Sequence, residues 1–259
     1  MPVFLFHDVI FGPVRSRRLG LSLGINPLPT HEKYCTFNCI YCECGWTEKI
    51  PGDMVSLPTR LQVREFLEQK LKALVLEEHL PDALTFAGNG EPTLHPDFPG
   101  IVDDTLALRD KYAPGAKVTV LSNASMIHDQ KVFQALLKLD NNIQKLDAGS
   151  GKLFQLINNP VQPERFEEMI LDLKKFNGQV IIQSLFLKGF YKDQSVDNTT
   201  EEELTAWLKH IEFIRPQKVM IYSLDRATPS HHLERFQFRN WRRLRRESGS
   251  LILELTYID

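Results

Sequence analysis

Three cysteines form the most chemically informative pattern in this sequence. Cys35, Cys39 and Cys42 lie in the run CTFNCIYC, separated by three and then two residues. On a short loop, this spacing lets three thiolates bind one small iron–sulfur cluster, and no fourth cysteine continues the pattern. A cluster held by three protein sulfurs leaves one iron open to a small molecule, which can bind there and receive an electron. The loop is therefore predicted to be a reaction centre.

The fourth cysteine, Cys44, leaves alternatives open. All four cysteines lie between positions 35 and 44, which is too tight a cluster for a disulfide framework in a chain of 259 residues and favours reduced thiols that bind metal. The alternative to a cluster is a structural zinc site completed by Cys44 or His31. Structural zinc usually uses two well-separated ligand pairs, whereas this chain has one compact triplet. We predict that Cys44 stays outside the cluster, as a buried thiol or a residue that faces the substrate.

Composition indicates one globular α/β domain. The chain is 42% hydrophobic and 25% charged, and α/β barrels of this length commonly form a single domain. A formal net charge of −2 gives no overall attraction to nucleic acid or to an anionic membrane. The sequence has no apolar run of 18 residues and its start does not resemble a signal peptide. The expectation is a cytoplasmic protein that does not bind membranes.

Helical and strand patterns alternate along the chain. A helix is predicted over 61–80, where Leu61, Phe66, Leu67, Leu71, Leu74 and Val75 recur at helical spacing. Further helices are predicted over 98–112, 131–139, 165–176 and 200–214. Strands are predicted over 21–26, 83–88, 117–123, 142–149, 179–187 and 218–223.

These patterns give about six βα units with right-handed crossovers. The predicted fold is a partial (β/α)6 TIM-like barrel with a parallel sheet, formed by a single domain over 1–259. An N-terminal extension of about 1–18 and an Arg-rich C-terminal end of about 232–259 flank it. Ligands of such sheets bind beyond the C-terminal ends of the strands, so the cluster is expected at that rim.

The cysteine loop and a second motif together resemble the radical S-adenosylmethionine (SAM) superfamily. Its signature is this three-cysteine spacing with an aromatic residue, here Tyr41, before the last cysteine. Gly90, Glu91 and Pro92 in TFAGNGEPTLHP resemble the family's GEP motif, which hydrogen-bonds the amino group of SAM. The opening GPVRSRRLGLSLGINPLP resembles a subgroup similar to the enzymes that make wyosine bases (4-demethylwyosine synthases) in tRNA, and this likeness covers about 230 residues.

The resemblance implies both cofactors and a reaction. Cys35, Cys39 and Cys42 would bind three irons of a 4Fe–4S cluster, and SAM would chelate the fourth. Reductive cleavage of SAM would then give a 5′-deoxyadenosyl radical that abstracts hydrogen from a substrate. Glu91 would accept a hydrogen bond from the SAM ammonium, and Gly88 and Gly90 would permit close backbone approach. An electron donor such as flavodoxin or ferredoxin is implied, while no catalytic acid or base is identified.

Polar residues at the ends of later strands complete the candidate site. Ser122 and Asn123 could meet the carboxylate or ribose of SAM, or could instead cap the next helix. Lys145 and Asp147 could bind the cofactor, or could form a plain ion pair. The residues placed nearer the substrate are Gln183, Ser184, Tyr222, Asp225 and Arg226.

The substrate is left open by the sequence. The resemblance suggests an RNA base, with a peptide or protein and a small metabolite as alternatives. Arginines lie before the first predicted strand and over 235–246, but a solvated surface explains them better than RNA binding. From a different class, the chain could be a noncatalytic metal-binding module that binds a protein partner.

Overall fold

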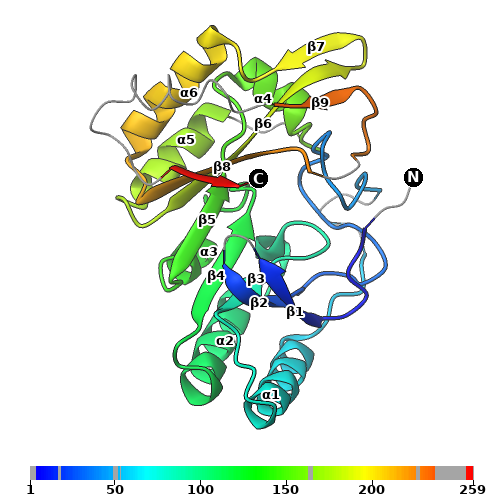
Figure 1. Cartoon of the computed structure of the whole chain (residues 1–259), viewed down its shortest axis with the longest axis vertical. Helices are drawn as coiled ribbons and strands as arrows, with labels where there is room; N and C mark the ends of the chain where they lie inside the picture. Colours follow the sequence, from blue (N-terminus) through cyan, green and yellow to red (C-terminus); the bar gives the residue numbers. More distant parts are fainter. Residues whose placement is uncertain are drawn as a thin grey trace. The chain divides into compact units, whose positions relative to one another are not determined.

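The computed structural model describes residues 4–16, 19–48, 52, 54–162, 166–225, 228–236 and 255–258 (Figure 1). The chain divides into two compact units. The N-terminal unit comprises Val3–Thr36 and Thr47–Ile143, and the C-terminal unit comprises Phe37–Trp46 and Gln144–Asp259 together with the first two residues. Among the described residues, no helix is both long and apolar enough to cross a membrane.

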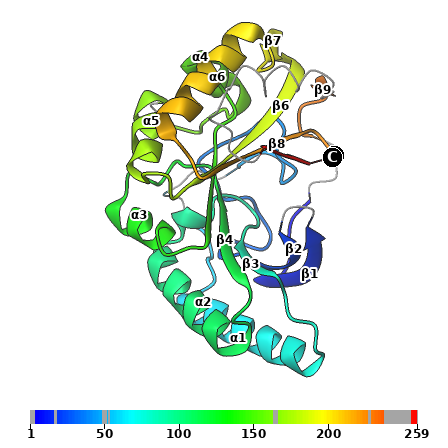
Figure 2. The same ribbon diagram turned by 60° about the vertical axis from the view of Figure 1, so that its left-hand side comes forward.

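Strands and helices alternate in the N-terminal unit. Its elements are β1 (Ile10–Ser16), β2 (Gly20–Ile25), α1 (Arg60–Leu76), β3 (Ala83–Phe86), the 3₁₀ helix η1 (Pro92–Leu94), α2 (Phe98–Tyr112), β4 (Lys117–Ser122) and α3 (Gln130–Leu136). The strand order is β1-β2-β3-β4; β2, β3 and β4 are parallel, while β1 is antiparallel to β2. Helices α1 and α2 pack side by side (Figures 1 and 2).

The C-terminal unit repeats this alternation. Its elements are α4 (Gly151–Ile157), α5 (Phe166–Lys175), β6 (Ile181–Tyr191), β7 (Gln194–Asp197), α6 (Glu201–Ile214), β8 (Lys218–Ser223), β9 (Leu233–Arg235) and β10 (Leu255–Ile258), while β5 (Asn141–Lys145) crosses the unit boundary. Strands β6, β8 and β10 are parallel, and β7 and β9 pair antiparallel with the far end of β6. Helices α5 and α6 lie side by side in both views (Figures 1 and 2).

Local sequence signals explain the helix starts. Thr59 and Gln62 form a capping box at α1: the Gln62 backbone donates to Thr59 Oγ1 (3.2 Å), and the Thr59 backbone donates to Gln62 Oε1 (2.8 Å). At α6, the Thr200 side chain accepts from the backbone N–H of Glu203 (3.3 Å). These caps fix where the helices begin, and therefore where the preceding loops lie.

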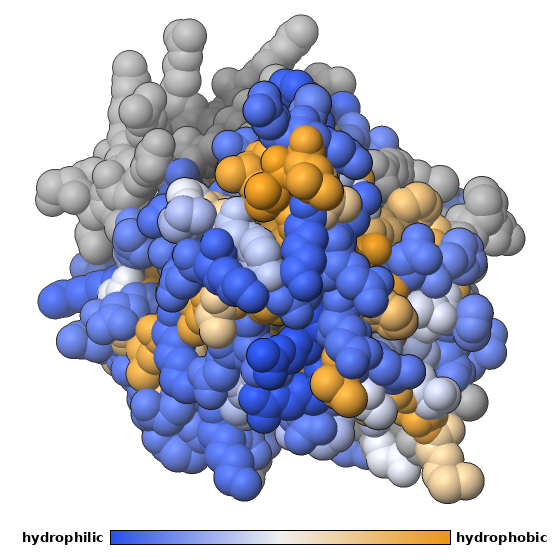
Figure 3. All heavy atoms as spheres, turned by 90° about the horizontal axis from the view of Figure 1, so that it is seen from below, coloured by the Kyte–Doolittle hydropathy of each residue, from blue (hydrophilic) through white to orange (hydrophobic). Residues whose placement is uncertain are grey.

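The six predicted strands are confirmed as β2, β3, β4, β5, β6 and β8, and the five predicted helices as α1, α2, α3, α5 and α6. The apolar residues whose spacing predicts α1 do not all face the core. Leu67, Leu71 and Leu74 are buried, but Leu61, Phe66 and Val75 are exposed, and Val63 is buried in their place. On the face drawn in Figure 3, hydrophobic side chains form small patches between hydrophilic ones.

Candidate functional site

The unit boundary falls inside the cysteine loop, which connects β2 to α1. Cys35 belongs to the N-terminal unit, and Cys39, Cys42 and Cys44 belong to the C-terminal unit. Cys35 is buried, the other three are half-buried, and none of the four forms a disulfide bond. Metal binding requires such thiols in the thiolate form.

In the N-terminal unit, the residue before Cys35 is joined to the GEP segment. Tyr34 and Gly90 form a parallel β-bridge: the Tyr34 backbone N donates to Asn89 O (2.8 Å), and Glu91 N donates to Tyr34 O (3.1 Å). Gly90 has φ +139°, and a Cβ placed on it would lie 1.8 Å from Tyr34 O. We predicted that this glycine permits approach to a cofactor; the close approach that the structure shows is to the backbone of the cysteine loop.

Gly88 meets a neighbour in the same way. Its φ is +153°, and an added Cβ would lie 2.3 Å from the Asn26 side-chain oxygen. Pro92 is buried at the first position of η1, where its fixed φ suits a helix start. Gly90 and Pro92 of the GEP motif thus each have a structural role of their own.

Glu91 is a buried carboxylate with several protein donors. It is 1% exposed, and its two oxygens accept from Asn123 N (2.6 Å), Thr93 N (3.1 Å) and Thr93 Oγ1 (2.5 Å). Burial raises the pKa of Glu91, although these hydrogen bonds act in the opposite direction. Glu91 is also the N-cap of η1, so it starts a short helix in addition to any binding role.

Ser122 ends β4, Asn123 follows it, and both shape the turn after the strand. Ser122 Oγ accepts from Ala124 N (3.1 Å), and Asn123 Oδ1 accepts from Ser125 N (2.9 Å). Helix α3 is capped by Asp129 instead, so the capping alternative for these two residues is wrong. Asn123 Nδ2 donates to Thr36 Oγ1 (2.8 Å) and to Cys35 Sγ (3.5 Å), which brings this turn to the first cysteine.

In the C-terminal unit, Asp147 is the centre of a buried polar network. It is 2% exposed and accepts from Leu185 N (2.8 Å), Asn158 Nδ2 (3.0 Å) and the Tyr41 hydroxyl. Lys145 Nζ lies 2.9 Å from Asp147 Oδ1, so the ion pair that the sequence left as an alternative is present. Tyr41, the aromatic residue before Cys42, is thus anchored to this carboxylate.

Lys145 joins the network to Tyr222. Its Nζ donates to Tyr222 OH (2.5 Å) and lies 4.5 Å from the centre of the Tyr222 ring. Burial alone would lower the pKa of Lys145, but the Asp147 carboxylate and Tyr222 outweigh it, and the pKa is raised. Burial, and then Asp147, raise the pKa of Tyr41 well above its ordinary value. At neutral pH the network therefore holds an ammonium and a neutral Tyr41 phenol.

The remaining predicted substrate residues do not form one cluster in the structure. Ser184 donates to Leu146 O and accepts from Trp207 Nε1 of α6 (3.0 Å), so it contacts the helix layer. Gln183, its neighbour on β6, is 3% exposed, and its Nε2 has no hydrogen-bond partner among the described residues. Asp225 is exposed, and Arg226 lies outside the described residues, as do most of the C-terminal arginines.

Asn158 is the site residue that sequence reasoning missed. It ends α4 as its C-cap, and its side-chain amide donates to Asp147 Oδ2 (3.0 Å) and to Cys39 Sγ (3.5 Å). The only sequence signal is the Asn-Asn-Pro run that follows an apolar segment, which is typical of a helix end. That signal predicts a cap and says nothing of a sulfur.

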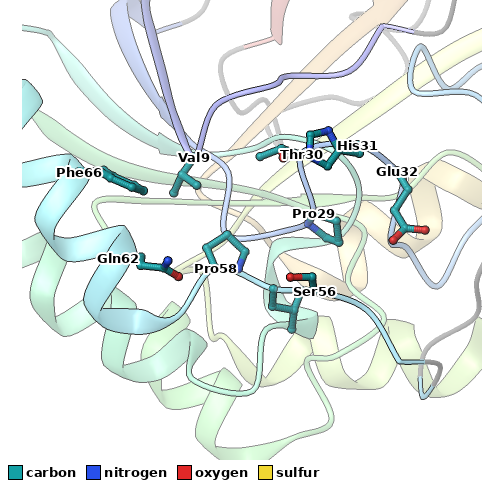
Figure 4. A pocket seen from close by; sticks show the side chains of 10 residues that line it. Val9, Pro29, Thr30, His31, Glu32, Ser56, Pro58, Gln62 and Phe66 are labelled. Carbon is teal, nitrogen blue, oxygen red and sulfur yellow. Dashed lines mark hydrogen bonds between the residues drawn. The ribbon is translucent and has the colours of Figure 1, made fainter.

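His31, the residue proposed to complete a zinc site, lines a separate pocket in the N-terminal unit. The pocket has a volume of about 240 Å³, and Figure 4 shows His31 beside Thr30, with Gln62 and Phe66 of α1 on the opposite wall. Within the described parts of the chain, no three His, Cys, Asp or Glu side chains stand where they could hold one metal ion. Each thiolate of an iron–sulfur cluster binds a different iron, so cluster ligands do not have to converge in that way.

We expect Asp147→Asn to lower the free energy of unfolding by about 3 to 5 kcal/mol, because it leaves the Lys145 ammonium buried without its counter-charge. The raised pKa of Lys145 means that the ion pair stabilises the fold below the ordinary lysine pKa of 10.5 and that this stabilisation is lost as the pH rises through the raised value. Urea unfolding at several pH values measures both effects.

The matched control is Asp193→Asn, at an exposed position with φ +60° that asparagine tolerates. It should change stability by less than about 0.5 kcal/mol. Equal effects of the two variants would contradict the importance of the Asp147 network.

Comparison with known proteins identifies relatives over most of the chain. Residues 31–201 match the model of the Radical SAM superfamily. The chain is 33% identical to a Brachyspira hyodysenteriae protein named GTPase Obg over 85% of its own length and 30% of that protein. It is 31% identical to a UPF0026 protein of Helicobacter pylori, over 85% of the chain and 67% of that protein.

Solved structures share the fold at low identity. A structure of TYW1 with a bound lysine–pyruvate adduct covers 88% of the chain and 72% of its own, with a TM-score of 0.60 and 16% identity. Streptococcus suis SuiB bound to precursor peptide SuiA covers 92% of the chain and 49% of its own, with a TM-score of 0.64 and 18% identity. The same protein has also been solved with S-adenosylmethionine. The predicted fold class, a mostly parallel sheet alternating with helices as in a partial TIM barrel, is confirmed.

Proposed function

Since the chain belongs to the Radical SAM superfamily, whose members use a 4Fe–4S cluster and SAM, we propose that Cys35, Cys39 and Cys42 hold that cluster. The proposed activity is reductive cleavage of SAM to a 5′-deoxyadenosyl radical, followed by hydrogen abstraction from a substrate. The cluster, when bound, supplies the electron for this cleavage.

One observation carries the proposal. The Tyr34–Gly90 bridge joins the residue before the first cysteine to the residue before Glu91. Within the N-terminal unit, the first proposed cluster cysteine and the carboxylate proposed to bind the SAM ammonium, about 55 residues apart in sequence, are thereby next to the two ends of one backbone bridge. The donor set also fits a cluster, because the Cys35 and Cys39 sulfurs each accept a hydrogen bond from an asparagine amide, which favours the thiolate form.

The protein side chains would bind and orient SAM. Glu91 offers its carboxylate to the SAM ammonium, since a carboxylate has about four acceptor positions. Ser122 and Asn123 would contact the carboxylate or the ribose of SAM. In the C-terminal unit, the Lys145 ammonium offers a cation to a carboxylate or phosphate, and Asp147 holds that ammonium in place through the 2.9 Å ion pair.

For the substrate, we propose an RNA base, on the strength of the resemblance to wyosine-type enzymes and the fold shared with TYW1. SuiB, solved with a precursor peptide, supports a peptide or protein substrate as the alternative. RNA binding depends steeply on salt because phosphate contacts release counterions. Activity on RNA that falls strongly between 50 and 200 mM salt would favour the first; activity that does not change with salt would favour a peptide or a small metabolite.

The test is anaerobic reconstitution with iron and sulfide, followed by an assay of SAM cleavage. In the cell, we propose a cytoplasmic location and an electron donor such as flavodoxin or ferredoxin; in the assay, dithionite replaces that donor. A brown protein that forms 5′-deoxyadenosine from SAM and dithionite is expected. A fully loaded protein that forms none would reject the enzymatic proposal. Metal analysis that finds one zinc and no sulfide would favour the noncatalytic metal-binding module instead.

A further inference from the structure

Side-chain amides donate hydrogen bonds to two of the three proposed cluster sulfurs. Asn158 Nδ2 lies 3.5 Å from Cys39 Sγ in the C-terminal unit, and Asn123 Nδ2 lies 3.5 Å from Cys35 Sγ in the N-terminal unit. We propose that both asparagines, through these hydrogen bonds to the cysteine sulfurs, make the cluster easier to reduce. This inference rests on the proposed function.

The amide of Asn158 has only one workable orientation. Its Nδ2 donates to both Asp147 Oδ2 (3.0 Å) and Cys39 Sγ, and exchanging Nδ2 with Oδ1 would place a carbonyl oxygen against the Asp147 carboxylate. Asn158 is 2% exposed, and its Oδ1 has no hydrogen-bond partner in the described part of the chain. A buried acceptor without a partner costs free energy. The position of Asn158 is therefore explained by the two hydrogen bonds that its Nδ2 donates, and not by its Oδ1.

The backbone holds Asn158 and Cys39 together. Asn38 N donates to Asn159 O (3.0 Å), Ile40 N donates to Ile157 O (3.0 Å), and Phe37 and Pro160 form an antiparallel bridge. Cys39 thus lies between two backbone hydrogen bonds that flank Asn158. The fold therefore holds the two backbones side by side, which places the Asn158 amide within reach of the Cys39 sulfur.

Asn123 is oriented by an equivalent arrangement. Its Oδ1 accepts from Ser125 N (2.9 Å), which leaves Nδ2 to donate to Thr36 Oγ1 (2.8 Å) and Cys35 Sγ. Exchange of the amide atoms would set Nδ2 against the Ser125 N–H. Each of the two units therefore supplies one oriented amide to its own cysteine.

The physical effect has a definite sign. Hydrogen bonds to the sulfurs are among the factors that set the reduction potential of iron–sulfur clusters. When one electron enters from the reductant, the sulfurs become more negative, and a donor N–H stabilises that state more than the oxidised one. The amide keeps its proton and no bond is broken. Removing either amide should therefore make reduction harder.

The experiment is a redox titration of the loaded protein followed by EPR. Asn158→Leu and Asn123→Leu should each shift the reduction equilibrium about three- to tenfold toward the oxidised cluster, which for a one-electron couple is about 30 to 60 mV more negative. The matched control is Asn141→Leu, which removes a half-buried amide that donates to Thr119 Oγ1 (3.0 Å) and not to sulfur. Its midpoint should equal that of the wild type.

A wild-type midpoint in both asparagine variants, with a full complement of iron and sulfide, would overturn this inference and leave the proposed function intact. If the variants fail to load, pulsed EPR of wild-type protein with ¹⁵N in the asparagine side chains decides: weak ¹⁵N coupling to the reduced cluster is expected, and its absence overturns the inference. A wild-type protein that binds no cluster would overturn both proposals.

Discussion

Replacing Cys35, Cys39 or Cys42 with alanine is expected to leave the reconstituted protein colourless and without measurable 5′-deoxyadenosine. Each thiolate is proposed to bind one iron, and none of the three has a substitute at the same spacing, so loss of any one removes a ligand that the cluster cannot replace. Iron and sulfide analysis together with chromatography of the SAM products measures both effects.

Cys44→Ala is the matched control, because Cys44 is also a half-buried thiol of the same loop but lies outside the three-cysteine spacing. It should retain the colour, the iron content and SAM cleavage of the wild type. Loss of the cluster in the Cys44 variant, with retention in one of the other three, would show that the ligand set is assigned wrongly.

Gly90→Ala is expected to prevent cluster loading almost as completely as loss of a cysteine. The added Cβ would lie 1.8 Å from Tyr34 O, and φ +139° is a conformation that an L-residue adopts only at a cost of about 1 to 3 kcal/mol. Relief of the clash requires the bridge to open, which displaces the residue before Cys35. Iron content and circular dichroism of the same samples distinguish lost loading from general unfolding.

The control for this prediction is Gly115→Ala. Gly115 lies in an exposed turn of the same unit, and an added Cβ would have no heavy atom within 4 Å. This variant should load and cleave SAM like the wild type. A Gly90→Ala protein that loads equally well would mean that the bridge does not position Cys35.

The alternation of strands and helices could be predicted from sequence because buried parallel strands are short apolar runs and the helices between them carry a periodic apolar face. The antiparallel additions were missed. β1 lies in the predicted N-terminal extension, and its run IFGPVRS contains a glycine and a proline, which argue against a strand. β7, in a stretch of polar residues, pairs with the exposed end of β6.

The buried face of α1 could not be predicted from the spacing of its apolar residues. Apolar residues occur on more than one side of this helix, so periodicity alone does not determine which stripe turns inward. Val63 is buried, whereas Phe66 is 43% exposed and lines the pocket of Figure 4. Only the packing of the neighbouring elements decides between the two stripes.

The parts of the candidate site that are contiguous in sequence could be predicted. The contacts between residues far apart in sequence could not. The cysteine loop and GEP can be recognised from the sequence. Asn158 contributes through the end of a helix more than 110 residues from Cys39, which no local pattern reveals. Gln183 and Ser184 were grouped together, but neighbouring strand residues point to opposite faces, and Ser184 contacts Trp207 on the helix side.

The backbone hydrogen bonds that flank Cys39 use no sulfur atom. The segment around this cysteine is therefore tied down by folding itself, before any iron arrives. The conformational entropy of this segment is lost on folding, so metal binding does not have to overcome that cost again. This contrasts with small zinc domains, in which the ion has to order the chain around it.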